Sequence, residues 1–510
     1  MKAVNLYLLT RNRNQNFYTQ YENILSARNE VLKVKEHEFE NLIHLVELLC
    51  QNGVSIRELE GFYYSYTIRQ IGKEFDLLKI RKNEAVLNIE LKSQDVPLEK
   101  IEKQLLKNQH YFGYIAPKSY LFTFVDETES LYIYADEQLR LCAFDELIQV
   151  LFQFHEFESG DIDALFCAKD YLISPLNMPQ KFVDGRYFLT QQQEMIKAEI
   201  LSQLAAGTHP LYRGITGAAG TGKTLLLYDL AKNCASDGRC CIIHCGLLCQ
   251  AHEILNTLLK NVTILAEESI DRADLGRCRF LFVDEAQHMR FETLTALIRC
   301  TKAYRIPCIF SYDYFQTLSK TEQRRNIPGR LKQLDTFLEY KLSGRIRSNE
   351  EMSSFIRKLL DLEDTSGKFY RYDAVDVVFA QNAQEAKEIL RYYSAVKHYT
   401  YIEHDTDGAP SEFLACLSNG FRTEDVIGQE FEQVVITLDH HFYYNDEGKL
   451  QGRNHPNPDY LYARLFFQAA SRTREKLCII VIGNVTLFEQ IVALKCSHLP
   501  FALHPAPGSQ

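Results

Sequence analysis

The chain has 510 residues, of which 46% are hydrophobic and 24% are charged, and its net charge is −10. This length predicts roughly three domains of about 150 residues each, and no window reaches the ~18 uncharged apolar residues of a membrane span. The negative charge excludes a protein that coats nucleic acid by charge alone, because such binding scales with the phosphates that Lys and Arg neutralise.

The start of the chain is polar and lacks the apolar core and cleavage site of a signal peptide, so we expect a cytoplasmic protein. The fourteen cysteines lie mostly in apolar runs, which is typical of reduced core residues. Cys241, Cys245 and Cys249 have a regular spacing, but no Cys-x-x-Cys pair or histidine set accompanies them. We therefore interpret them as structural residues.

The first predicted domain, residues 1–165, combines helices and strands. A helical segment with an apolar face ends at Asn52-Gly53. The elements expected after it are a hairpin over 75–80 and 85–92, a helix over 98–109, and strands over 119–125 and 130–134. This order predicts an α+β unit.

Asp76, Glu90 and Lys92 lie on the predicted hairpin. Residues two apart on a strand share a face, so Glu90 and Lys92 point the same way and Asp76 on the neighbouring strand can approach them. Two carboxylates can hold Mg²⁺ or Mn²⁺, and the lysine can position or activate the water that attacks phosphorus. The pattern predicts a metal-dependent phosphodiesterase.

This arrangement resembles the PD-(D/E)xK nucleases. The resemblance implies a further metal-proximal carboxylate, Glu40, in the opening helix and a glutamine, Gln104, in the helix after the hairpin. Three other glutamates, Glu47, Glu58 and Glu60, compete for the first of these roles. An ordinary charged hairpin and a degenerate nuclease fold are the alternatives, since Glu-x-Lys is a short pattern that occurs four times in the chain.

A polar stretch with two prolines, 174–179, predicts a linker. Beyond it, apolar runs alternate with helical patterns at 240–244, 279–283, 307–311, 433–438 and 477–482. This alternation predicts parallel α/β sheets with crossover helices. We assign domains to 166–335 and 336–510 and expect a loose tail after residue 500.

The segment from Gly217 to Thr224 matches the full phosphate-loop pattern and precedes a helix-forming run. Glycines in such a loop let backbone N–H groups converge on phosphate oxygens at a helix N-terminus, the lysine reaches the β and γ phosphates, and the threonine holds Mg²⁺. The predicted nucleotide-binding residues are Gly217, Gly220, Thr221, Gly222, Lys223 and Thr224.

A second half-site follows the apolar run 280–283, which ends in Asp284 and Glu285. At the carboxyl end of a strand, Asp284 can bind Mg²⁺ through water, and Glu285 can orient or deprotonate the attacking water. The sequence therefore predicts ATP hydrolysis as well as ATP binding.

The run Asp284-Glu285-Ala286-Gln287 after a phosphate loop resembles motif II of the superfamily 1 DNA/RNA helicases, the UvrD/Rep and Schlafen-like group. Further motifs follow in the same order between about 185 and 485, and the resemblance implies two RecA-like P-loop domains. It places motif Ia, a single-strand contact, at 244–255. It also assigns adenine reading to Gln193, γ-phosphate sensing to Gln316, ribose contact to Glu430, and arginine fingers to Arg347 and Arg472.

The chain departs from this family in three respects. Ile346 stands where an aromatic residue usually stacks on adenine, and Tyr312 stands where motif III usually has glycine. The segments that carry accessory domains in related helicases are short here. The motifs therefore predict a minimal core and do not distinguish unwinding from translocation or switching.

We expect a nuclease-helicase fusion that uses ATP and Mg²⁺, with Mn²⁺ as an alternative at the nuclease site. Its expected substrate is single-stranded or partly duplex DNA, with RNA as the alternative. We expect no membrane partner. Such fusions imply defence against foreign nucleic acid or DNA repair. Two other readings stay open: an ATP switch that controls the nuclease without unwinding, and a scaffold that grips a partner protein or a second copy.

Overall fold

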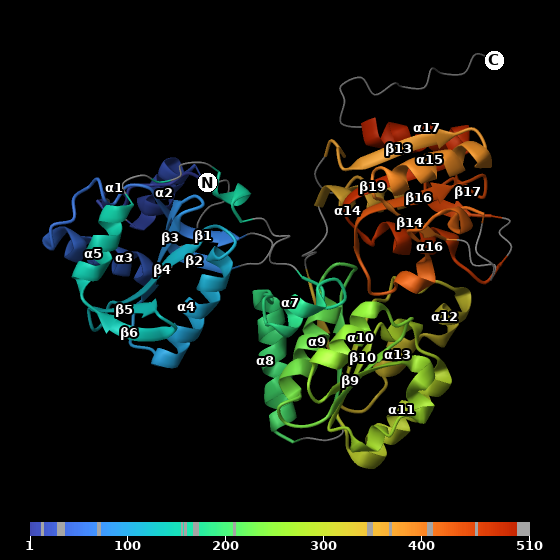
Figure 1. The fold of residues 1–510 in the computed structure, drawn as a ribbon, viewed down its shortest axis with the longest axis horizontal. Coiled ribbons are helices and arrows are strands. Elements are labelled where there is room, and N and C mark those ends of the chain that lie inside the picture. The colour runs from blue at the N-terminus through green and yellow to red at the C-terminus, as the bar shows by residue number, and fades with distance from the viewer. Residues whose placement is uncertain are drawn as a thin grey trace. The chain divides into compact units, whose positions relative to one another are not determined.

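The computed structural model describes residues 1–11, 15–27, 36–68, 73–154, 157, 161–166, 173–207, 211–343, 350–366, 370–404, 412–453 and 457–496. The chain divides into a unit of Met1–Leu172 and a unit of Ile173–Gln510 (Figure 1). None of the described helices is long and apolar enough to cross a membrane. Every cysteine in the described ranges is free, including Cys241, Cys245 and Cys249.

The first unit contains a six-stranded sheet in the order β1-β2-β3-β4-β5-β6. Its strands are β1 (Phe62–Ile68), β2 (Lys73–Arg81), β3 (Ala85–Lys92), β4 (Lys118–Val125), β5 (Ser130–Ala135) and β6 (Gln138–Cys142). β3 and β4 are parallel, and the other neighbours are antiparallel. The predicted hairpin is confirmed as β2–β3, with Leu77 opposite Ile89.

The helices of this unit are α1 (Leu6–Leu9), α2 (Gln15–Ser26), α3 (Glu36–Gln51), α4 (Leu98–Phe112) and α5 (Phe144–Gln153), with a 3₁₀ turn over Ile162–Ala164. α4 connects the parallel strands β3 and β4, a connection that needs a crossover segment. α3 buries Phe39, Leu42, Leu45, Val46 and Leu49 in one cluster with residues of β3, β4 and α5. This cluster is the core on one face of the sheet.

The second unit begins with a parallel sheet in the order β12-β7-β11-β10-β8-β9, which we call lobe 1. Its strands are β7 (Tyr212–Thr216), β8 (Cys240–His244), β9 (Val262–Ala266), β10 (Phe280–Asp284), β11 (Cys308–Tyr312) and β12 (Leu338–Lys341). Its helices are α7 (Pro179–Val183), α8 (Gln191–Ala205), α9 (Lys223–Cys234), α10 (Gln250–Leu258), α11 (Phe291–Tyr304), α12 (Lys320–Arg325) and α13 (Ile327–Leu331).

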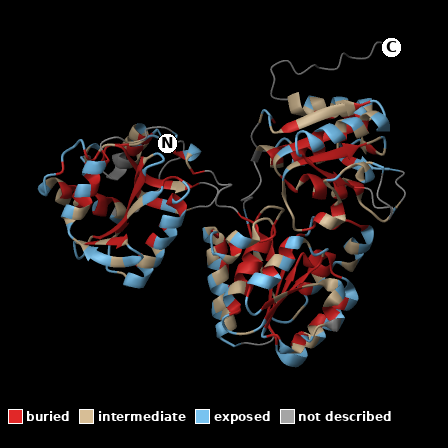
Figure 2. Cartoon of the chain, in the orientation of Figure 1, coloured by how far each residue is buried: buried red, intermediate tan, exposed pale blue. Residues whose placement is uncertain are grey.

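Alternate residues of the lobe 1 strands enter two different cores. Ile242 and Phe282 pack with α8, α9 and α10, whereas Ile243 and Val283 pack with α11 and α13. The strands are therefore buried on both faces (Figure 2), which explains why their sequences are continuous apolar runs.

The rest of the second unit, which we call lobe 2, has a parallel sheet in the order β13-β19-β16-β14-β15. The strands are β13 (Val375–Ala380), β14 (Thr400–Glu403), β15 (Gly420–Arg422), β16 (Phe431–Leu438) and β19 (Thr473–Ile482), with a separate hairpin of β17 (Phe442–Tyr444) and β18 (Leu450–Gly452). The helices are α14 (Glu350–Leu360), α15 (Ala383–Ala395), α16 (Tyr462–Ala470) and α17 (Val485–Cys496). The two parallel sheets are RecA-like, as predicted.

Candidate functional site

The loop between β7 and α9 has the shape of an anion cradle. Gly220 and Gly222 have φ angles of 76° and 82°, in the left-handed region that glycine adopts readily. A Cβ added to Gly217 would lie 2.7 Å from Thr221 Oγ1 and 3.0 Å from the Leu342 carbonyl oxygen, so no larger residue fits there. Because α9 begins directly after the loop, its first N–H groups can donate to an anion held in the loop.

Lys223 folds back onto this loop. Its ammonium group donates hydrogen bonds to the carbonyl oxygens of Gly217 at 2.8 Å and Ala218 at 3.1 Å. It also lies 3.8 Å from a carboxylate oxygen of Asp313, which follows β11. A phosphate placed in the loop would contact this ammonium group directly, which is the contact that we predict for Lys223.

Thr224, in the first turn of α9, meets Asp284, the last residue of β10. Thr224 Oγ1 donates to Asp284 Oδ1 at 3.3 Å, and Ser311 Oγ donates to the same oxygen. Asp284 is fully buried, and its other oxygen, Oδ2, has no hydrogen-bond partner among the described residues. A hydroxyl and a carboxylate with an open oxygen fit the ligand preference of Mg²⁺.

Glu285 occupies the turn after β10 with a φ angle of 55°, which is uncommon for a residue with a side chain. Gln287 fixes the carboxylate: its amide donates to Glu285 Oε2 at 2.7 Å and accepts from the Asp313 N–H at 3.1 Å. Burial alone would raise the pKa of Glu285, but the charges of Lys223, Arg472 and His288 and the hydrogen bond from Gln287 together lower it. Glu285 is therefore an ionised, positioned acceptor.

Two predicted glutamines have different surroundings. Gln193 caps α8 together with Thr190, and its amide donates to the carbonyl oxygens of Thr221 at 3.1 Å and Gly222 at 3.3 Å. It therefore ties α8 to the phosphate loop, while its role in adenine reading stays a prediction. Gln316 is buried beyond β11, and its Nε2 has no hydrogen-bond partner in the described ranges.

Lobe 2 supplies Arg472 to this site. Its guanidinium group is held by the Gln429 carbonyl oxygen at 3.4 Å and by two oxygens of Gln468 at 3.3 Å. A pocket beside the phosphate loop is lined by Ala219 and Gly220 together with lobe 2 residues that include Glu430, Ser471 and Arg474. The structure thus brings Glu430 and Arg472 to the predicted site, whereas Arg347 lies outside the described residues.

A buried pair of histidines lies beside Asp284. His244 Nδ1 is 3.6 Å from Asp284 Oδ2, and the His244 and His252 ring centroids are 4.6 Å apart. Burial, assisted by the charge of His244, lowers the pKa of His252 to about 3. A Cβ on Gly428 of lobe 2 would lie 3.3 Å from His244 Cε1, so a side chain at position 428 would press on this ring.

The predicted motif Ia segment is therefore divided. His244, His252 and Leu255 are buried and cannot touch a nucleic-acid strand directly, which corrects the expectation for those positions. Leu247 and Leu248 are exposed. For His244 the reason is the strand order: β8 lies beside β10, which pairs His244 with Asp284.

In the first unit, the structure brings Asp76, Glu90 and Gln104 together. The β2–β3 register places Asp76 opposite Glu90, one step beyond the last paired residues. The Leu91 N–H donates to Asp76 at 2.7 Å, and Gln104 donates to Glu90 Oε2. Burial and the charge of Glu90 raise the pKa of Asp76, and the hydrogen bond from Leu91 and the charge of Lys92 oppose this effect. A divalent cation between the carboxylates would relieve their repulsion.

Two asparagines that we did not predict complete the environment of Glu90. Asn88 donates to Glu90 Oε1 at 3.1 Å, and Asn108 donates to the same oxygen at 2.8 Å. Both oxygens of this buried carboxylate therefore receive amide hydrogen bonds. Spacing could have found Asn88, which is two before Glu90 on β3, whereas Asn108 reaches Glu90 from another element, α4.

Glu40 does not join this group. Its side chain is 64% exposed, and the ion pair recorded for it is with His37, at 4.0 Å. The neighbouring residue Asn41 is buried and donates instead to Ser93, just after β3, at 2.9 Å. The side of α3 that carries Phe39 and Leu42 packs inward, and Glu40 points to solvent.

Comparison with known protein families concerns the central part of the chain. Residues 214–399 match the family described as Schlafen group 3, DNA/RNA helicase domain. This segment is similar to a helicase domain. It includes the phosphate loop, Asp284, Glu285 and Gln316, so the family match and the site geometry concern the same residues. No curated protein matches the sequence.

Similar solved structures include helicases. A structure of two coordinating Pif1 helicases that unwind forked double-stranded DNA is 12% identical, with 59% of this chain and 94% of that chain covered and a TM-score of 0.34. Pif1 from Bacteroides with ADP-AlF3 and single-stranded DNA is 13% identical, with 57% and 92% covered and a TM-score of 0.33. The arterivirus nonstructural protein 10 helicase with DNA is 14% identical, with 57% and 64% covered and a TM-score of 0.31.

Proposed function

We propose that the second unit is an ATP-driven motor that moves along single-stranded or partly duplex nucleic acid. The observation that carries this proposal is the convergence of both lobes on one site. Residues of both lobes line one pocket beside the phosphate loop, Ala219 and Gly220 from lobe 1 and Glu430, Ser471 and Arg474 from lobe 2. A nucleotide bound there would link the two lobes, so its hydrolysis would change how they pack.

In this proposal, Lys223, Arg472 and Glu285 have separate roles in ATP hydrolysis. Lys223 leaves its two carbonyl partners and binds the β and γ phosphates, while Arg472 stabilises the charge that develops on the transferred group. Mg²⁺, when bound by Thr224 and Asp284, supplies further charge neutralisation. Glu285, held by Gln287, accepts a hydrogen bond from the attacking water and orients it.

The proposed nucleic-acid path follows the charge of the grooves. One groove has five acidic residues, Glu267, Glu268, Glu322, Glu424 and Asp459, against Arg325 and His288. A neighbouring groove is lined by Lys320, Arg453 and Arg464 together with Tyr460 and Gln323. Cationic and aromatic side chains suit phosphates and unstacked bases, so we place the strand in the second groove.

The motor is tested by the Lys223→Ala variant, with Lys260→Ala as its matched control on the surface of the same lobe. Without the ammonium group the phosphates lose their main positive partner, so we expect at least about a 100-fold loss of ATP hydrolysis. Steady-state ATPase assays with and without single-stranded DNA measure it. Turnover by Lys223→Ala equal to that of the control would contradict an ATPase at this site.

We further propose that the first unit is a Mg²⁺- or Mn²⁺-dependent nuclease. Asp76 and Glu90 would hold the metal, Lys92 would position the attacking water, and Gln104 would orient Glu90. The combination of a nuclease with an ATP-driven motor suggests a role in defence against foreign nucleic acid, with DNA repair as the alternative.

The alternative is an ATP-regulated switch or scaffold with a degenerate nuclease fold. Two observations favour it: amide groups engage both oxygens of Glu90, and one groove of the second unit is acidic. Cleavage of single-stranded DNA or RNA in Mn²⁺ supports the nuclease, and its absence supports the scaffold. A strand-displacement assay separates a helicase from a switch.

A further inference from the structure

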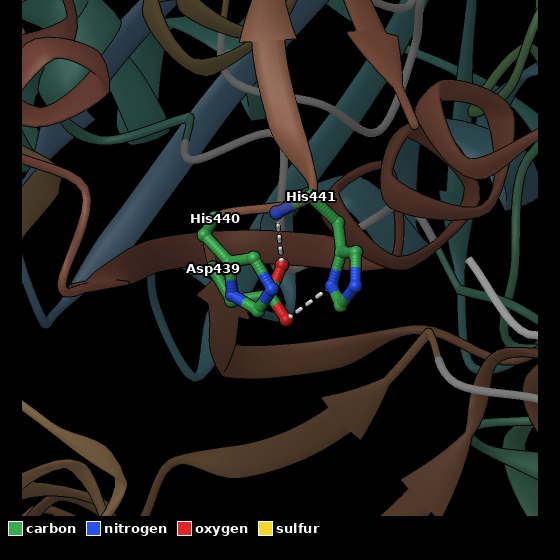
Figure 3. A group of neighbouring side chains, drawn as sticks. All are labelled: Asp439, His440 and His441. Atoms are coloured by element: carbon green, nitrogen blue, oxygen red, sulfur yellow. Dashed lines mark hydrogen bonds and ion pairs between the residues drawn. The ribbon is translucent and has the colours of Figure 1, made fainter. Parts of the chain in front are cut away.

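Three consecutive side chains gather at the carboxyl end of β16: Asp439, His440 and His441 (Figure 3). Each offers a ligand atom, and these atoms lie within 4.8 Å of one another. The two imidazole rings have centroids 4.0 Å apart. Neighbouring residues of an extended strand point to opposite faces, so the chain must turn here to bring both rings to one side.

The turn that achieves this is fixed by hydrogen bonds. The His441 N–H donates to Asp439 Oδ1 at 2.9 Å, and His441 Nδ1 lies 2.9 Å from Asp439 Oδ2. Asn484 donates to the carbonyl oxygens of Asp439 at 3.2 Å and Phe442 at 2.9 Å. The backbone on both sides of the histidines is therefore held in place, as a metal site requires of its supporting residues.

The group is accessible from solvent. His440 is exposed, and the side chains of His441 and Asp439 are 23% and 36% exposed. An ion could therefore reach all three residues without opening the fold. Among the described residues, this is the one group of three or more His, Cys, Asp or Glu side chains whose ligand atoms all lie within 4.8 Å of one another.

We propose that Asp439, His440 and His441 bind a divalent transition metal ion of the zinc class. Two imidazoles and one carboxylate suit Zn²⁺ and its neighbours rather than Mg²⁺ or Ca²⁺, which prefer oxygen ligands only. Ligand atoms about 2.0 Å from a tetrahedral zinc ion lie about 3.3 Å apart, so small side-chain rotations complete the site. Solvent or another ligand takes the remaining position.

The hydrogen bond between His441 Nδ1 and Asp439 Oδ2 leaves two ways for His441 to bind the ion. In the first, the metal binds at Nδ1, the ring proton moves to the other ring nitrogen, and the hydrogen bond is lost. In the second, the hydrogen bond stays, and His441 binds the metal through its other nitrogen while Asp439 orients the ring.

The test uses the full chain and Zn²⁺ alone as the probe, in excess Mg²⁺ so that sites built of oxygen ligands are occupied. His440→Asn is compared with His398→Asn, an exposed histidine of the same unit whose φ of 61° asparagine tolerates. We expect the unmutated chain and His398→Asn to bind one more Zn²⁺ than His440→Asn. Equal stoichiometry in all three would overturn the proposal.

Co²⁺ gives a second, spectroscopic readout. A visible d–d absorption band that His440→Asn removes and His398→Asn retains is the expected result. A thiolate-to-cobalt charge-transfer band that persists in His440→Asn would assign the ion to cysteines and overturn the proposal. Far-UV circular dichroism checks that both variants are folded. Neither readout depends on ATP hydrolysis or nucleic-acid cleavage, so failure of the proposed function would leave this test intact.

Discussion

The two candidate catalytic sites hold their buried carboxylates in opposite ways. In lobe 1, Asp284 Oδ2 and Gln316 Nε2 have no hydrogen-bond partners among the described residues. In the first unit, both oxygens of Glu90 accept hydrogen bonds from Gln104, Asn88 and Asn108. A buried polar atom without a partner costs about 1–3 kcal/mol, so the first arrangement favours a ligand and the second is satisfied without one.

The largest effect that we expect in the first unit is on metal-dependent cleavage. Lys92→Met removes the cation beside Asp76 and Glu90, and we expect at least about a 100-fold loss of metal-dependent cleavage. Lys82→Met, on the exposed β2–β3 turn, is the matched control. Glu40→Ala should leave the rate within about twofold, because its side chain points to solvent. Cleavage rates on single-stranded DNA in Mn²⁺ measure all three variants.

Cleavage by Lys92→Met at the control rate would remove this lysine from the mechanism. A large loss in Glu40→Ala would instead restore the metal role that sequence resemblance implies for that residue.

Because, among the described residues, Glu90 accepts hydrogen bonds at both oxygens and Asp284 at only one, replacing each with its amide should change stability in opposite directions. Glu90→Gln places an amide against three amide donors and should lower the free energy of unfolding of the first unit by about 1–3 kcal/mol. Asp284→Asn removes a buried charge with an open oxygen and should leave the second unit equally or more stable, while impairing ATP hydrolysis. Calorimetric unfolding without nucleotide or metal compares them. Greater destabilisation by Asp284→Asn would contradict the comparison.

The histidine pair beside Asp284 predicts a pH dependence. The pKa of His252 falls from 6.5 to about 3 in the folded chain, so the unfolded chain binds more protons below pH 6.5. The neutral His252 side chain makes its full contribution to the free energy of unfolding above pH 6.5. This contribution is lost as the pH falls toward 3, and about 2 kcal/mol of it is lost at pH 5. Unfolding free energies from pH 7 to 5 should fall less in His252→Gln than in His398→Asn. If the unfolding free energies of both variants fall equally with pH, a residue other than His252 takes up the proton on unfolding.

Local patterns in the sequence were enough to predict much of both sites. The phosphate loop follows from eight consecutive residues, and Glu90 with Lys92 follows from the two-residue period of a strand. The continuous apolar runs predicted the parallel strands because those strands are buried on both faces.

What the sequence missed depends on packing between distant segments. His244 lies beside Asp284 only because β8 and β10 are neighbours in the sheet, and the chain order does not contain that pairing. Asn108 reaches Glu90 only through the packing of α4 on β3. Glu40 was assigned from resemblance, and the rotation of α3 about its axis, set by its buried face, turns it away.

The central claim is that both lobes build one ATP site, and Arg472 tests it most directly. Arg472→Ala should retain ATP binding within about threefold but lose about 1,000-fold in turnover, with Arg472→Lys in between because lysine lacks the planar fork. The control is Arg371→Ala, whose side chain is 78% exposed. ATP binding and single-turnover hydrolysis are measured on the same samples. Turnover of Arg472→Ala equal to that of the control would contradict a site shared by two lobes.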